Sequence, residues 1–327
     1  MIQVEGLTKD YGIRRAIDNL TFHAEKGEIL GFLGPNGAGK TTTMRILCGY
    51  MPPTSGIAKV AGFDVVDQSL EVRKRVGYMP ETVPLYPDMS VFDYLKFMAD
   101  LRHLPDVEDK VDEVLEVVHM EDRAESMISS LSKGMRQRVG IAQAIIHRPE
   151  VLILDEPTIG LDPAQIVEVR NLIRDLGRER TILLSTHILS EAQQLCDRVL
   201  IINKGRIAAE DTPERLQARL TGSGRVFLKI KGDDDGFEKL VKSISGVLDI
   251  FPEGNGTYEV NTVAGQDLRP EIARTVVNGG FDLLEIRPVG MSLEEIFMQL
   301  TRDEPQPPEV SDEGFIEEEP QSLDEAS

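Results

Sequence analysis

The first 220 residues alternate short apolar runs with longer amphipathic stretches. The apolar run at 29–33 predicts a buried strand, and the glycine-rich turn after it leads into a helix predicted from about 39 to 48. Further apolar runs predict buried strands at 151–154, 181–185 and 199–203. Strands that alternate with helices in this way favour an α/β fold around a largely parallel sheet.

One internal stretch departs from this alternation. Residues 82–131 contain no strand-type run, and Ser90 followed by Asp93 matches a helix-capping pattern. Apolar residues at a spacing typical of an amphipathic helix follow at Val111, Val114, Leu115 and Val118. We therefore expect a helical subdomain, at about 82–140, inserted into the α/β core.

The Thr-Gly-Ser-Gly segment at 221–224 marks a change in composition, which we interpret as the boundary between a first domain at 1–220 and a second at 221–302. The second domain is predicted to contain strands at 225–231, 247–252, 256–263 and 281–287, and helices at 235–245, 267–278 and 292–301. The order strand-helix-strand-strand-helix-strand favours a ferredoxin-like α+β domain. From 303 to 327 proline and acidic residues dominate, which predicts a disordered acidic tail.

The charge of the chain is strongly acidic and unevenly distributed. The formal net charge is −20, and residues 303–327 hold ten acidic residues and no basic one. Nucleic-acid binding requires a dense set of Lys and Arg side chains against the phosphates. The composition therefore disfavours nucleic acid as a partner.

The apolar runs and the cysteines indicate where in the cell the protein is located. The longest apolar runs are too short to cross a bilayer, and the first residues show neither the basic flank nor the apolar region of a signal peptide. Cys48 and Cys196 are far apart, without the spacing of a metal site, and we expect two buried thiols in a reducing environment. These features predict a cytoplasmic protein.

The most specific motif follows the strand predicted at 29–33. It matches the phosphate-loop pattern G-x-x-x-x-G-K-[ST] and consists of Gly34, Pro35, Asn36, Gly37, Ala38, Gly39, Lys40 and Thr41, with Thr42 as the next residue. Backbone N–H groups of such a loop converge on phosphate oxygens at the positive end of a helix. Lys40 is expected to reach the β- and γ-phosphates, and Thr41 to bind Mg²⁺.

A second motif places two carboxylates at the end of a buried strand. The apolar residues 151–154 are followed by Asp155 and Glu156. Ligands of parallel sheets bind at the carboxyl ends of the strands. Asp155 is a candidate Mg²⁺ ligand, and Glu156 is a candidate base that accepts a proton from the attacking water.

A third motif lies about twenty residues before Asp155 and consists of Leu131, Ser132, Lys133, Gly134 and Met135. It resembles the L-S-G-G-Q signature of ABC-type ATPases, with departures at Lys133 and Met135. Ser132 is expected to cap the following helix, whose amides would form a second anion site. Together the three motifs resemble the ATP-binding subunit of an ABC transporter, and the resemblance extends over the first 220 residues.

That resemblance implies further roles. Tyr11 is at the position that stacks on adenine, and His187 corresponds to the histidine that contacts the γ-phosphate. Asp162 matches the loop that communicates between two ATP sites. Glu81 stands where the family usually has a Gln that touches Mg²⁺ and the permease contact region. A carboxylate keeps an oxygen ligand for the metal and adds a negative charge.

The same resemblance implies the partners and cofactors. Two ATPase subunits would pack head to tail around ATP and Mg²⁺, so that Ser132 and Gly134 of one copy close over the nucleotide held by the other. A homodimer is expected, attached to a separate permease at the cytoplasmic face of the membrane. Lys133, Met135, Glu81 and the segment 291–297 resemble the exporter branch that includes drug-resistance, sodium-efflux and gliding-motility-type ATPases.

Two other functions are compatible with parts of the sequence. An ABC ATPase in translation or DNA maintenance would act without a permease, but the single phosphate loop and the acidic charge disfavour it. A regulatory subunit that binds ATP without hydrolysis is disfavoured by the joint presence of Lys40, Asp155, Glu156 and His187.

Overall fold

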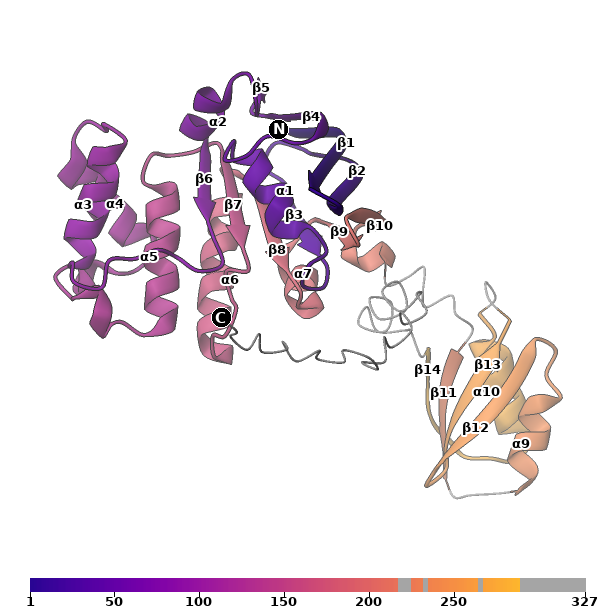
Figure 1. Ribbon diagram of the computed structural model, residues 1–327. Helices are drawn as coiled ribbons and strands as arrows, with labels where there is room; N and C mark the ends of the chain where they lie inside the picture. The colour runs from indigo at the N-terminus through magenta and orange to yellow at the C-terminus, as the bar shows by residue number, and fades with distance from the viewer. Residues whose placement is uncertain (217–224, 232–234, 264–266, 289–327) are drawn as a thin grey trace, which may run out of the picture.

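The computed structural model describes residues 1–216, 225–231, 235–263 and 267–288 (Figure 1). The predicted helix at 292–301 and the acidic tail at 303–327 lie outside these residues.

A six-stranded sheet forms the centre of the first domain. Its strands, in spatial order, are β10 (Arg206–Asp211), β9 (Arg198–Asn203), β3 (Ile29–Leu33), β8 (Thr181–Thr186), β7 (Val151–Asp155) and β6 (Val76–Met79). All neighbours are parallel except β10, which pairs antiparallel with β9. The four strands predicted from apolar runs are confirmed to within one residue at each end, and so is the α/β fold.

Alternating side chains of this sheet enter two separate hydrophobic cores. Leu152 and Leu154 face the core that includes α6 (Pro163–Gly177), α7 (Leu189–Leu195) and the helices described next. Val151 and Ile153 face the opposite core. That core is covered by α1 (Lys40–Leu47) and by a second, mainly antiparallel sheet. A strand buried on both faces explains why 151–154 is a continuous apolar run.

The second sheet comes mostly from the N-terminal part of the chain. It contains, in spatial order, β2 (Arg14–Ala24), β1 (Ile2–Tyr11), β4 (Ser55–Val60) and β5 (Phe63–Asp64), and α2 (Ser69–Arg75) follows it. The sequence patterns did not predict this sheet. Register shifts in the β1–β2 pairing interrupt the alternation that would have indicated it.

Helices fill the stretch in which no strand was predicted. They are α3 (Val91–Leu101), α4 (Val107–Val117), the short 3₁₀ turns Glu121–Arg123 and Ile128–Ser130, and α5 (Lys133–Ile145). Ser90 caps α3, because its Oγ accepts a hydrogen bond from the Asp93 amide at 3.0 Å. The four apolar side chains predicted to line a helix, from Val111 to Val118, are all buried. Figure 1 shows α3, α4 and α5 as a group beside β6.

Residues 225–288 form a separate sheet with its own core. The strands are ordered β12 (Val247–Gly254), β13 (Thr257–Thr262), β11 (Arg225–Ile230) and β14 (Leu283–Pro288), and all neighbours are antiparallel. The helices α9 (Asp235–Lys242) and α10 (Arg269–Asn278) supply Phe237, Ile272 and Val276 to its core. Within the described residues, no helix has both the length and the hydropathy needed to cross a bilayer.

His147 lies in a largely apolar surrounding that disfavours its protonated form. Its Nε2 lies 3.1 Å from the carbonyl oxygen of Val76 at the start of β6. Burial, together with the nearby Arg102 guanidinium, lowers the pKa of His147 to about 4. The folded state therefore holds this imidazole neutral over a pH range in which a free histidine is protonated.

We expect the free energy of unfolding to fall as the pH drops below about 6.5, because the unfolded chain then binds a proton that folded His147 accepts only near pH 4. The variant His147→Gln keeps an N–H donor for Val76 but cannot take up this proton. Its urea midpoint should fall less between pH 7 and pH 5 than that of the parent. Equal decreases in the two chains would contradict this role of His147.

Candidate functional site

The loop between β3 and α1 depends on glycines with little space around them. Gly39 has φ of +106°, and a Cβ on it would lie 2.7 Å from the carbonyl oxygen of Ala16. A Cβ on Gly34 would overlap the carbonyl oxygen of Ile202. Lys40 folds back over the loop and donates a hydrogen bond to the carbonyl oxygen of Gly34 at 2.6 Å. The side chain of Lys40 is only 6% exposed, so its charge lies in the interior.

The end of β7 places two carboxylates against the neighbouring strand. Asp155 and Glu156 are 1% and 5% exposed. Ser185 on β8 donates to Asp155 Oδ1 at 2.5 Å, and its Oγ accepts a hydrogen bond from the Glu156 amide at 2.9 Å. Glu156 has φ of +51°, a left-handed conformation that turns its side chain out of the strand direction. Ser185 therefore stabilises the backbone turn at Glu156, the residue that follows β7.

Glu156 connects the phosphate-loop lysine with His187. Its Oε1 forms an ion pair with Lys40 Nζ at 3.3 Å, and its Oε2 lies 2.8 Å from His187 Nδ1. The histidine is the most exposed of the three, at 41% of its side chain. A buried carboxylate requires such partners, because the desolvation of an isolated charge costs several kcal/mol, on the order of the whole ion-pair energy. The three residues predicted to be catalytic thus lie together.

A cavity of about 530 Å³ opens beside this cluster. It is lined by Tyr11, Arg14, Ala16, Pro35, Asn36, Gly37, Gly39, Lys40, Thr41, Thr42, Arg45, Glu81 and Glu156. Tyr11 is 47% exposed and carries the Lys9 ammonium over its ring, 5.5 Å from the centroid. Most residues predicted to bind nucleotide, together with the predicted metal ligands Thr41 and Glu81, therefore share one cavity.

The signature residues lie elsewhere in the same copy. Ser132 caps α5, and its Oγ accepts a hydrogen bond from the Met135 amide at 3.2 Å. Ser132, Gly134 and Met135 line a different cavity of about 300 Å³. Asp162 caps α6 by accepting from the Gln165 amide at 2.9 Å, and it lines neither of these two cavities. A single copy does not bring the signature and the phosphate loop together.

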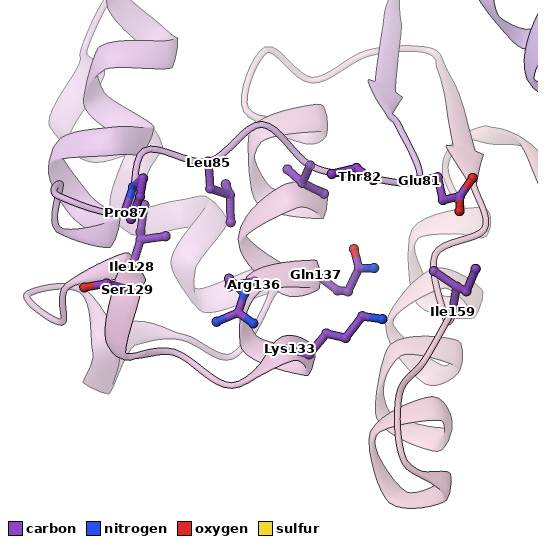
Figure 2. Close-up of a pocket in the computed structure, with 11 residues that line it drawn as sticks. Glu81, Thr82, Leu85, Pro87, Ile128, Ser129, Lys133, Arg136, Gln137 and Ile159 are labelled. Atoms are coloured by element: carbon purple, nitrogen blue, oxygen red, sulfur yellow. The ribbon is translucent and has the colours of Figure 1, made fainter.

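Two of the three departures from the family pattern, Glu81 and Lys133, line a third cavity, of about 610 Å³ (Figure 2). Glu81 belongs to this cavity as well as to the phosphate-loop cavity. Lys133 extends from the start of α5 toward Ile159, and its ammonium lies against Gly160, in the loop that follows Glu156. Gln137, one turn further along α5, is buried and lines the same cavity.

Sequence reasoning missed three groups at the site. Arg14 and Arg45 line the phosphate-loop cavity and add positive charge to it. Ser185 binds the Asp155 carboxylate and the Glu156 backbone amide, but a serine within an apolar strand gives no local signal of such a role. Its importance follows only from the parallel pairing of Asp155 with Ser185.

The comparisons with known proteins agree with this geometry. A sequence profile of the family described as ABC transporter matches residues 17–159. The chain is 37% identical over 303 residues to the bacitracin transport ATP-binding protein BcrA of Bacillus licheniformis, which covers 92% of this chain and 97% of that protein. It belongs to the ABC transporter family. Within that family it is an ATP-binding and ATP-hydrolysing subunit, as the motifs predicted.

Two further relatives support the assignment. The daunorubicin resistance ATP-binding protein DrrA3 of Streptomyces coeruleorubidus is 33% identical over 307 residues, which are 93% of this chain and 96% of that protein. A solved structure described as the ATP-binding subunit of an ABC transporter is 32% identical, with a TM-score of 0.60, and the match covers 67% of this chain and 92% of that one. Subunits of this family dimerise and act with membrane permease subunits.

We expect Gly39→Ala to weaken ATP binding by at least about 10-fold, because the added methyl group meets the Ala16 carbonyl and displaces the loop that holds Lys40. Gly62→Ala is the matched control, since Gly62 also has a positive φ, of +85°, but nothing lies within 4 Å of its Cβ position. The control should lose about 1 kcal/mol of stability and keep the parental affinity. Equal nucleotide affinities in the two variants, measured by calorimetry, would refute the steric argument.

Proposed function

We propose that this chain hydrolyses ATP at the phosphate-loop cavity and that the released energy drives export through a separate membrane permease. The buried contact of Glu156 with both Lys40 and His187 carries the proposal, because it aligns a base, a phosphate-binding cation and an orienting imidazole at one cavity.

Magnesium fits the oxygen donors at this site. Asp155 Oδ2 is buried without a hydrogen-bond partner among the described residues, and hard oxygen ligands of this kind suit Mg²⁺. We assign Asp155, the Thr41 hydroxyl and Glu81 to the metal. When bound, the ion would neutralise charge on the phosphates.

Side chains and backbone amides of the protein bind the nucleotide and activate the attacking water. Backbone N–H groups of residues 36–39 and the Lys40 ammonium hold the phosphate oxygens, and Tyr11 stacks on the base. Glu156 accepts the proton of the water that attacks the γ-phosphate. His187 holds the Glu156 carboxylate through Nδ1 and orients the water. Arg14 and Arg45 add positive charge around the phosphates.

A second copy would complete the site. Because the signature and the phosphate loop occupy different cavities in one copy, we propose a head-to-tail homodimer. In it, residues 131–135 of each copy close over the nucleotide held by the other, and the loop with Asp162 joins the two sites. ATP would then link the copies, and hydrolysis would release them.

The remaining parts of the chain serve attachment and assembly in this proposal. Residues 1–220 form the nucleotide-binding domain, and its helices at about 82–140 transmit closure to the permease at the cytoplasmic face of the membrane. Residues 221–302 form a ferredoxin-like accessory domain, whose strand order β12-β13-β11-β14 with two helices supports this assignment.

Export is favoured over other functions by the names of several relatives. Besides the bacitracin transport and daunorubicin resistance proteins, a linearmycin resistance ATP-binding protein of Bacillus subtilis is 31% identical over 92% of this chain. A role in translation or DNA maintenance is not favoured, since none of these relatives is described in that way.

Glu156→Gln should bind ATP with parental affinity and lower turnover by about 10²–10⁴, the usual contribution of a general base. The amide is isosteric but cannot accept the proton. Phosphate release at saturating ATP, beside an equilibrium binding measurement, tests this. Parental turnover in the variant would remove Glu156 from the mechanism.

Asn36→Cys in one chain and Ser132→Cys in another should form a disulfide between copies when ATP is added to chains that also carry Glu156→Gln. Background reaction is low, because both native thiols are buried, which raises the pKa of Cys48 and of Cys196. Non-reducing electrophoresis of the mixture reports the product, and each single variant alone is the control. If no ATP-dependent disulfide formed, the head-to-tail arrangement would be wrong.

A further inference from the structure

Glu191 on α7 is a buried acid that no motif of the sequence assigned. Its side chain is 7% exposed. Its Oε2 accepts two hydrogen bonds from hydroxyl groups, from Thr158 Oγ1 at 2.6 Å and from Thr186 Oγ1 at 3.2 Å. Both threonines are buried as well. One carboxylate oxygen therefore joins two segments that are far apart along the chain.

These two segments carry the reactive side chains. Thr158 lies two residues after Glu156, in the loop that leads from β7 to α6. Thr186 ends β8 and directly precedes His187. The Thr186 hydroxyl also accepts a hydrogen bond from the Ile188 amide at 2.9 Å, so it holds the chain on the far side of the histidine too. Glu191 thus holds the loop that follows Glu156 and the end of the strand that precedes His187.

In the part of the chain that the structure describes, the other side-chain hydrogen bonds between the two segments are those of Ser185, on the strand side, and the Glu156–His187 contact itself. We propose that Glu191 is a positioning residue for ATP hydrolysis, which sets the separation of Glu156 and His187 by binding Thr158 and Thr186 together. The inference rests on the roles proposed above for Glu156 and His187. It adds a residue that touches neither the nucleotide nor the water.

The chemistry of the position supports a role beyond packing. Burying a carboxylate costs free energy unless it is well compensated, and an apolar side chain of similar size would avoid that cost. Within the described part of the chain, no cation forms an ion pair with Glu191, and no donor reaches its Oε1. What this position supplies is an oxygen that accepts hydrogen bonds from two hydroxyl groups at once, which the amide oxygen of a glutamine can also do.

Steady-state ATP hydrolysis by the full chain tests the proposal. Glu191→Ala should lower kcat by about 10- to 100-fold, the cost of a displacement of about 1 Å at a reactive pair. The KM for ATP should stay within about 2-fold, because the phosphate loop is not disturbed. Glu191→Gln should recover most of the lost kcat, since its amide oxygen accepts both hydrogen bonds. Ser190→Ala, an exposed change on the same helix, is the matched control.

A second background separates positioning from general destabilisation. In a chain with His187→Ala, adding Glu191→Ala should lower kcat by less than about 3-fold, because residues that act through one another are not additive. Equal losses in both backgrounds, or equal losses for Glu191→Ala and Glu191→Gln, would overturn the proposal. If Glu191→Ala fails to fold, Thr158→Val removes one of the two hydrogen bonds at nearly constant volume and must show the same pattern.

The result also distinguishes this inference from the proposed function. Parental turnover in His187→Ala alone would refute the role of His187. The positioning role would then be decided by Glu191→Ala and Thr158→Val in the otherwise unaltered chain, where parental kcat would refute it.

Discussion

The site depends on stabilising three charged side chains that are buried away from solvent. Lys40, Asp155 and Glu156 are nearly inaccessible, yet all three are ionisable. Such groups are tolerated only when each has opposite charges or hydrogen bonds around it. The ion pair of Lys40 with Glu156, the serine on β8 and the histidine after β8 meet that need. A polyphosphate with its metal would supply further partners, which makes the site selective for a highly charged ligand.

The arrangement of layers explains why these charges can be held so firmly. β3, β8 and β7 are adjacent in that order in the sheet and are buried on both faces, so their carboxyl ends have little freedom to move. The phosphate loop follows β3, the carboxylates follow β7, and the histidine follows β8. The signature belongs to the helical group beside β6, whose apolar side chains share one core with side chains of β3, β7 and β8. The phosphate loop and the signature are therefore held at separate places on one packed unit.

The parts of the site that the sequence predicted are those whose signal is local. The phosphate loop and the pair Asp155–Glu156 combine an apolar strand with adjacent reactive residues, so both could be found without knowledge of distant contacts. Ser185 and Glu191 could not be found in this way, because each has a partner about thirty residues away, Glu156 and Thr158 respectively, which it meets only through strand pairing and packing. The antiparallel sheet of β1, β2, β4 and β5 was missed because irregular register interrupts its alternation. The left-handed backbone at Glu156 was equally unpredictable, since nothing but tertiary packing favours that conformation for a glutamate.

Position 11 is suited to a fluorescent probe. The chain contains no tryptophan, and this half-exposed ring is one of the walls of the phosphate-loop cavity. An indole placed there by Tyr11→Trp would be the sole tryptophan fluorophore of the chain, and the base stacking proposed for this position would alter its emission. Nucleotide arrival and departure could then be followed in real time on the isolated chain, without an attached dye.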